Sequence, residues 1–111
     1  AAHITFDLIL DLVSDHFGVP VEELVGRRRT RDVAIARQVA MYLARDLTEM
    51  SLPQIGDALG GRDHTTVMHG CNKISALFDR DDHMRRQVLE VKNRIYSDGQ
   101  RVPEAQRVGT A

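Results

Sequence analysis

The chain has 111 residues with a net charge of −1, 42% hydrophobic residues, 5% aromatic residues and no Trp. This length supports one domain around a single hydrophobic core, which must be mostly aliphatic. No run of about 18 apolar residues would form a transmembrane helix, no signal peptide is recognisable, and the single cysteine, Cys71, excludes an intramolecular disulfide. We therefore expect a soluble cytoplasmic protein.

The net charge hides a segregation of acidic and basic residues along the chain. Residues 1–26 contain five acidic residues and no Lys or Arg, whereas residues 27–45 contain six arginines and one acid, Asp32. Phosphate affinity depends on the local potential at the contact surface rather than on the total charge. The sequence is therefore compatible with a basic surface that binds nucleic acid.

The first predicted element is an amphipathic helix over residues 4–17. Apolar residues recur there at helical spacing, with three aspartates on the opposite side. Thr5 or His3 lies near its start, and Gly18 ends it.

Two further helices follow in the N-terminal half. Pro20 can open a short helix through Leu24, because proline is tolerated at the start of a helix. A long helix then begins at about Asp32, the expected N-cap, and ends at Leu47 or Thr48.

The next segment carries strong helix-boundary signals. Ser51 and Gln54 form a capping-box pattern that opens a fourth helix, and Gly60-Gly61 terminates that helix in a turn. Asp63 is the expected N-cap of a fifth helix.

Apolar residues recur at helical spacing along one face of the fifth helix, which we expect to be buried. The same spacing recurs in a sixth helix that starts after residues 81–82. The two expected buried stripes are Val67, Cys71, Ile74 and Phe78, and Met84, Val88, Val91 and Ile95. From Ser97 onward, glycine, proline and few apolar residues indicate a disordered tail. We expect an all-α fold of about six helices, with a domain over residues 1–98 and a tail over residues 99–111.

The segment from Ser51 to Val67 has the arrangement of a helix-turn-helix, in which the second helix enters the major groove of DNA. The first turn of that helix carries residue types that suit base edges. Asp accepts from the cytosine amino group, Thr offers a methyl group to thymine, and His donates to an acceptor edge. Small hydrogen-bonding side chains here favour DNA contact, although Asp63 is also explained by helix capping alone. The candidate residues are Asp63, His64, Thr65 and Thr66.

The arginine loop, defined as Gly26 to Arg31, is the second candidate for DNA contact. A charge run is usually a solvated loop, yet these like charges repel one another unless an anion is present. A flexible arginine arm beside a helix-turn-helix commonly reaches the adjacent minor groove. Arg37 and Gln38 can be either surface residues or phosphate ligands, and the residues alone do not decide between these roles.

The sequence does not predict an enzyme or a metal site. The spacings of His64, His69, Cys71 and His83 do not fit zinc ligands. A calcium-loop pattern starting at Asp79 fails because Met84 stands where glycine is needed. We find no phosphate-binding glycine loop, nucleophile elbow or pair of catalytic carboxylates.

Four stretches closely resemble the C-terminal DNA-binding domain, domain IV, of the bacterial chromosomal replication initiator DnaA. They are RRRTR at 27–31, ARQVAMYLAR at 36–45, SLPQIG at 51–56 and GGRDHTTV at 60–67. The likeness runs from about Thr5 to Tyr96. Gly70, inside the predicted recognition helix, is a departure that should cost up to about 1 kcal/mol relative to Ala.

The resemblance implies a Trp-repressor-like helical domain that binds double-stranded DNA at short asymmetric boxes similar to TTATCCACA in the replication origin. It implies that Arg29 enters the minor groove, while Asp63, His64, Thr65 and Thr66 read the major groove. The implied phosphate contacts are Arg27, Arg31, Arg37, Gln38, and the backbone near Leu52 and Pro53. Full-length members carry an ATP-binding module, so ATP or ADP is expected only in a full-length parent protein and no cofactor or metal is expected in this chain.

Three functions fit these features. The first is recognition of the replication origin by a domain of a full initiator, acting in the cytoplasm on the nucleoid. The second is a free-standing DnaA-related regulator at the same boxes. The third is a protein-interaction module for regulators of the initiator, which would have no use for Arg29 or for residues 63–66. No dimer seam is apparent, so we expect a monomer.

Overall fold

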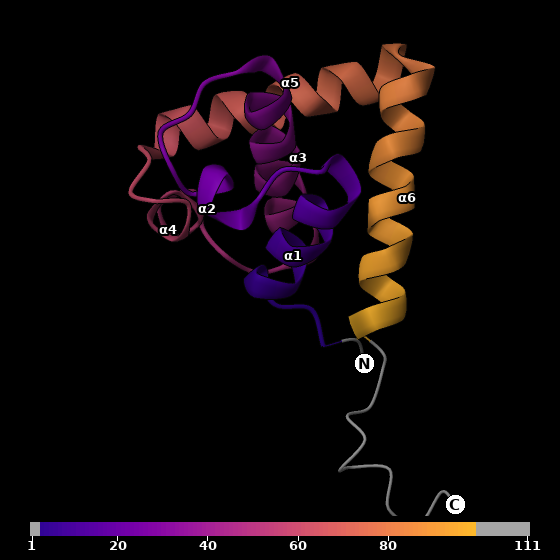
Figure 1. The fold of residues 1–111 in the computed structure, drawn as a ribbon, viewed down its shortest axis with the longest axis horizontal. Coiled ribbons are helices and arrows are strands. Elements are labelled where there is room, and N and C mark those ends of the chain that lie inside the picture. The colour runs from indigo at the N-terminus through magenta and orange to yellow at the C-terminus, as the bar shows by residue number, and fades with distance from the viewer. Residues whose placement is uncertain (1–2, 100–111) are drawn as a thin grey trace, which may run out of the picture.

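The computed structural model describes residues 3–99 and contains no strand within them. Its six helices are α1 Phe6–Phe17, α2 Val21–Leu24, α3 Arg31–Leu47, α4 Leu52–Ala58, α5 His64–Arg80 and α6 Asp82–Gly99 (Figure 1). The predicted all-α class is confirmed. Across residues 3–99, no helix combines the length and the apolar character that crossing a membrane requires.

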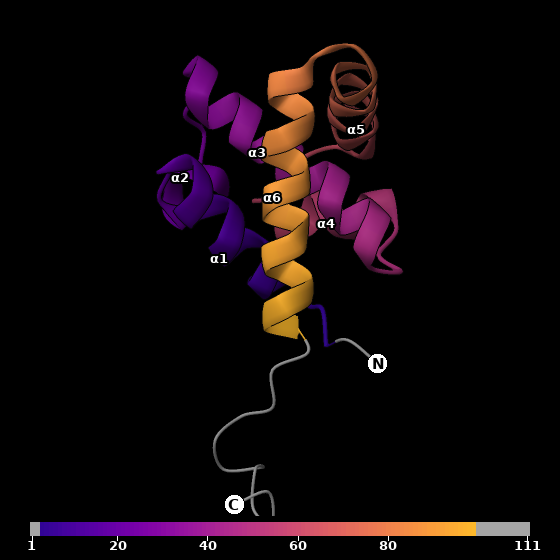
Figure 2. The same cartoon turned by 90° about the vertical axis from the view of Figure 1, so that its right-hand side faces the viewer.

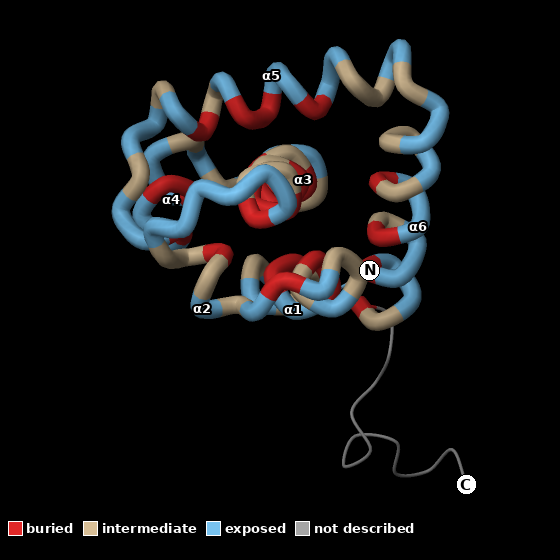
Figure 3. The backbone as a smooth tube through the Cα atoms, turned by 45° about the horizontal axis from the view of Figure 1, so that its top comes forward, coloured by how far each residue is buried: buried red, intermediate tan, exposed pale blue. Residues whose placement is uncertain are grey.

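Helix α3 forms the centre of the bundle, packing against α5 on one side and α1 on the other. Figure 3 shows buried residues of the surrounding helices facing α3, and Figure 2 shows α6 running down the front of the bundle. The core is aliphatic, as the composition predicted. Its largest fully buried side chains include Leu24, Met41, Leu43, Ile55, Ile74 and Ile95.

A glycine allows α5 to approach α3 closely. A Cβ atom added at Gly70 would lie 2.5 Å from the Met41 sulfur and 3.4 Å from Cγ of Gln38. The departure seen in the sequence at Gly70 therefore has a packing role, because the missing side chain lets the recognition helix rest on α3.

The helix boundaries agree with most of the capping signals. Thr5 caps α1 by accepting a hydrogen bond from the Leu8 amide at 3.2 Å, and Gly18 ends it at φ 66°. Asp32, however, is not the N-cap of α3: Thr30 holds that position and Asp32 lies in the first helical turn. A carboxylate is favourable there as well, because it faces the positive end of the helix dipole.

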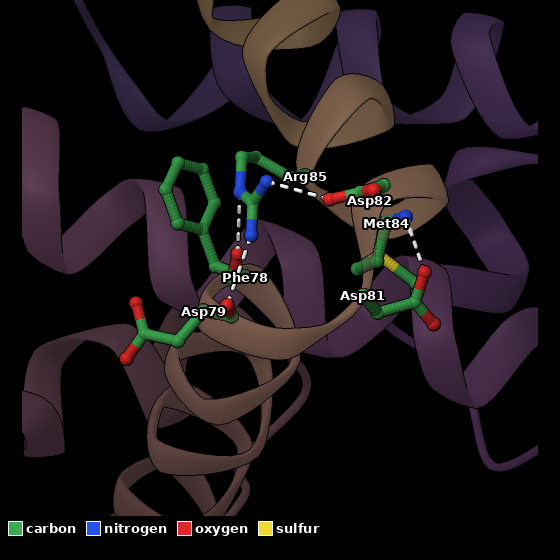
Figure 4. A network of polar contacts seen from close by, with 6 residues as sticks. All are labelled: Phe78, Asp79, Asp81, Asp82, Met84 and Arg85. Atoms are coloured by element: carbon green, nitrogen blue, oxygen red, sulfur yellow. Dashed lines mark hydrogen bonds and ion pairs between the residues drawn. The ribbon is translucent and has the colours of Figure 1, made fainter.

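Arg85 fixes the joint between α5 and α6 (Figure 4). Its Nε and Nη2 donate to the carbonyl oxygens of Phe78 and Asp79 at 2.8 and 2.9 Å, and its Nη1 donates to Asp82 at 2.8 Å. Asp81 accepts from the Met84 amide at 3.0 Å. These bonds satisfy the carbonyls at the end of α5 and an amide at the start of α6, so the angle between the two helices is well defined.

Helices α1 and α6 run antiparallel and bring the ends of the described chain together. The His3 amide donates to the Gly99 carbonyl at 2.7 Å, and Arg94 bonds Asp15 at 2.7 Å. Gly99 is buried and is the last residue of α6, so residues 97–99 continue the helix rather than begin a disordered tail. The division into a domain over residues 1–98 and a tail over residues 99–111 stays a prediction. The rest of the expected tail, residues 100–111, lies outside the described residues.

Candidate nucleic-acid interface

The turn between α4 and α5 is built around Gly56 and two further glycines. The Gly56 carbonyl accepts hydrogen bonds from the amides of Leu59, Gly61 and Arg62 at 2.8–3.1 Å. A Cβ on Gly56 would lie 2.0 Å from the Arg62 carbonyl oxygen, so no larger residue fits this approach. Gly60 and Gly61 have φ of 79° and 82°, a region that L side chains rarely adopt. This geometry confirms the predicted helix-turn-helix.

Asp63 caps the recognition helix α5, as predicted. Its Oδ2 accepts a hydrogen bond from the Thr65 amide at 3.0 Å, and this bond lowers the pKa of Asp63. The Asp63 and His64 side chains are 65% and 60% exposed, Thr66 is exposed, and Thr65 is half-buried. The N-terminal turn of α5 thus presents a carboxylate, an imidazole and two hydroxyl groups.

Arg37 holds the arginine loop in place. Its Nε donates to the Leu24 carbonyl at 2.7 Å, and its Nη2 donates to the carbonyls of Glu23, Gly26 and Arg28 at 2.7–3.3 Å. Arg37 is only 6% exposed, so the alternative that it is an ordinary surface residue is wrong. The guanidinium thereby gives hydrogen-bond donors to backbone carbonyls at the end of α2 and in the arginine loop. Its contact with phosphate stays a prediction.

Arg62 is a functional candidate that the sequence reasoning missed. It donates from Nη1 to the Leu59 carbonyl and from Nη2 to the Gly26 carbonyl, 36 residues away in the sequence. The turn of the helix-turn-helix is thereby joined to the arginine loop. The only available signal was its place in the GGRDHTTV stretch, directly before the Asp63 cap.

These elements surround one open hollow of about 650 Å³. Its lining includes residues from the arginine loop, α3, the glycine turn and α5, among them Arg27, Arg29, Arg37, Gln38, Gly61, Arg62 and Thr66. Burial lowers the pKa of Arg62 and Arg37, and repulsion lowers each further, from Arg29 on Arg62 and from Arg62 on Arg37. Mutually repelling guanidinium groups around a hollow are suited to an anion such as phosphate.

The other expected contact residues lie outside this hollow. Arg31 is the first residue of α3 rather than part of the loop, and it lines a second hollow near the α5–α6 joint. Leu52 and Pro53 form the first turn of α4, where Pro53 is exposed. Gln38 lines the main hollow, and its Oε1 is buried without a hydrogen-bond partner.

Comparison with known proteins identifies the family. The model of the bacterial DnaA protein helix-turn-helix matches residues 6–74. The chain belongs to this family. It is 52% identical over 92 residues to the chromosomal replication initiator protein DnaA of Chloroflexus aggregans, and 51% identical over 92 residues to that of Chloroflexus aurantiacus. Each alignment covers 83% of this chain but 19% of the relative, so the chain spans about a fifth of the length of these curated relatives.

Membership of the DnaA family agrees with the geometry of the site. The matched residues include the arginine loop, α4, the glycine turn and the first turns of α5. The DnaA helix-turn-helix is a DNA-binding unit, and the predicted DNA-binding class is confirmed at that level. Among residues 3–99, no group of three His, Cys, Asp or Glu side chains is placed to hold a metal ion.

Proposed function

We propose that this domain binds double-stranded DNA sequence-specifically, at boxes similar to TTATCCACA in a bacterial replication origin. The observation that carries the proposal is the position of Arg29 and Thr66 on the lining of one hollow, beside the exposed first turn of α5. A recognition helix in the major groove leaves a neighbouring arm free to enter the adjacent minor groove. The arginine loop has the place and charge of such an arm.

The proposed base contacts divide between the two grooves. Residues 63–66 would face base edges in the major groove, where each base pair presents a distinct pattern of donors and acceptors to carboxylate, imidazole and hydroxyl groups. Arg29, which is exposed, would enter the minor groove, whose negative potential in A·T-rich DNA attracts arginine.

Phosphate contacts would fix the register of the domain on the duplex without reading sequence. We assign them to Arg27, Arg31, Arg37, Gln38, and the backbone near Leu52 and Pro53. Arg37 has the weakest case as a direct ligand, because its Nε and Nη2 already bond carbonyls of the protein. The relatives are named as replication initiators, so this domain would act as the DNA-binding part of such a protein, as a monomer, in the cytoplasm and on the nucleoid.

A binding titration tests the proposal directly. The domain should bind a duplex carrying one box about 10³-fold or more tightly than a scrambled duplex of equal length, at the same salt concentration. Equal affinity for both duplexes would contradict sequence-specific binding and would leave the protein-interaction module as the better interpretation.

Salt dependence tests the phosphate contacts separately. Arg27→Ala should weaken binding to both duplexes and lower the slope of log K against log salt by about one unit. Arg86 is an exposed arginine on α6, at the opposite side of the bundle from α4 (Figure 1), and Arg86→Ala is the matched control that should leave the slope unchanged. Equal slopes for wild type and Arg27→Ala would remove Arg27 from the interface.

A further inference from the structure

Two separate segments meet at one backbone carbonyl, that of Gly26. Arg62 donates to it from the helix-turn-helix turn, and Arg37 donates to it from α3 at 3.3 Å. Arg62 also donates to Leu59 within its own turn. Each of these two guanidinium groups therefore spans several carbonyls, which the planar fork of arginine can do and a lysine ammonium cannot reproduce.

The backbone around Arg62 is fixed as well. Its amide donates to the Gly56 carbonyl at 2.8 Å, and the next residue, Asp63, caps α5. A Cβ on Gly60 would lie 2.1 Å from the Val25 carbonyl, so the turn touches the chain just before the arginine loop. Figure 1 shows the α2–α3 link at the same end of the molecule as the start of α5.

We propose that Arg62 is a positioning residue that joins the arginine loop and the recognition helix into one preformed reading surface. In the free protein it holds the loop so that Arg29 lies beside the first turn of α5. The entropy of ordering the loop is then lost on folding rather than on DNA binding, which raises affinity through pre-organisation. The DNA part of this inference rests on the proposed function; the arrangement of the free loop does not.

Tryptic cleavage of the free protein tests the arrangement without DNA. Outside α3 the loop contains three candidate sites, at Arg27, Arg28 and Arg29. If Arg62 pins the loop, Arg62→Met should raise the rate of cleavage within residues 26–31 by about tenfold, because cleavage follows the population of the opened segment. Mass spectrometry identifies the cut, and a thermal scan verifies that the variant is folded.

The matched control is Arg28→Met. Arg28 is exposed and its Nε lies 3.4 Å from Glu23, so this change removes one positive charge from the loop without removing a bridge to the turn. Its remaining sites should be cleaved at the wild-type rate. A similar acceleration in Arg28→Met, or none in Arg62→Met, would overturn the proposal. Arg62→Lys keeps the charge but loses the fork, and wild-type protection in this variant would also overturn it.

A double-mutant cycle on the box duplex tests the coupling to DNA reading. Arg29→Ala should weaken binding about tenfold in the wild type and about threefold or less in the Arg62→Met background, because an unpinned arm contributes less. Equal factors in both backgrounds would contradict coupling. If the wild type shows no preference for the box at all, the proposed function fails, and the tryptic assay still decides the role of Arg62.

Discussion

Arg37 donates its Nε–H to the carbonyl oxygen of Leu24 at 2.7 Å, and this buried bond ties the central helix α3 to α2. The remaining bonds of the same guanidinium reach carbonyls of Glu23 and of the arginine loop. The sequence left Arg37 as either a surface residue or a phosphate ligand. In the structure, Arg37 holds the backbone of the arginine loop in place.

The first prediction is that Arg37→Lys lowers the free energy of unfolding by about 2 to 4 kcal/mol, because one buried and three partly buried carbonyl oxygens lose the donors of the guanidinium fork. Urea unfolding measures the change. The matched control is Arg31→Lys, at the exposed first residue of α3, which should shift stability by less than about 0.5 kcal/mol. Unchanged stability in Arg37→Lys with weakened DNA binding would instead make Arg37 mainly a phosphate ligand.

The second prediction compares two neighbouring glycines of the turn. Both have positive φ, but a Cβ on Gly60 meets the Val25 carbonyl at 2.1 Å, whereas a Cβ on Gly61 meets nothing within 4 Å. Gly61→Ala should cost about 1 kcal/mol from backbone strain alone. Gly60→Ala should cost roughly 3 kcal/mol, because the turn must also move away from the chain that leads into the arginine loop. Equal losses in the free energy of unfolding, measured with urea, would show that the contact with the Val25 carbonyl adds no cost at position 60.

The third prediction concerns Asp63 and pH. Its amide hydrogen bond from Thr65 lowers the pKa of the folded carboxyl group below the unfolded value of about 3.9. The ionised carboxylate therefore stabilises the fold above that pH, and the contribution is lost as the pH falls through the lowered folded pKa. Asp63→Asn caps without titrating, so the difference in Tm between wild type and variant should change as the pH is lowered from 6 to about 2, with the wild type losing stability relative to the variant. A constant difference in Tm would mean that protonation of the Asp63 carboxylate does not weaken the cap of α5.

The same variant separates capping from base reading. Asp63→Asn would place an amide where a cytosine amino group requires an acceptor. We expect this variant to fold normally, to keep its affinity for scrambled DNA and to discriminate less at the C·G pairs of the box. Full discrimination would restrict Asp63 to capping.

Local signals in the sequence predicted the boundaries of most helices. The Ser51–Gln54 capping box, the Gly18 end of α1 and the Asp63 cap depend on residues within a few positions of one another, so the pattern alone reveals them. Thr30 rather than Asp32 is the N-cap of α3. Thr and Asp are both suitable N-cap residues, so residue type alone did not separate the two positions. The helical end of α6 was missed because Gly99 is held by the distant His3.

The site was only partly predictable, for a related reason. Exposed residues such as Arg29 and His64 were singled out because their chemistry suits contact with DNA. Arg37 and Arg62 act on carbonyls up to 36 residues away, and a charge in the sequence does not show whether it faces an anion or the backbone. Gly70 likewise looked like a weak point of a helix until its approach to Met41 was seen.

The most direct test of the account is the specificity of the first turn of α5. Alanine variants at His64, Thr65 and Thr66 should be titrated in parallel on a box duplex and a scrambled duplex at one salt concentration. Each substitution should cost about 1 to 3 kcal/mol on the box and much less on the scrambled duplex, because lost base contacts affect only the cognate sequence. Equal losses on both duplexes would show that these residues only position the helix, and would contradict direct reading of the major groove by α5.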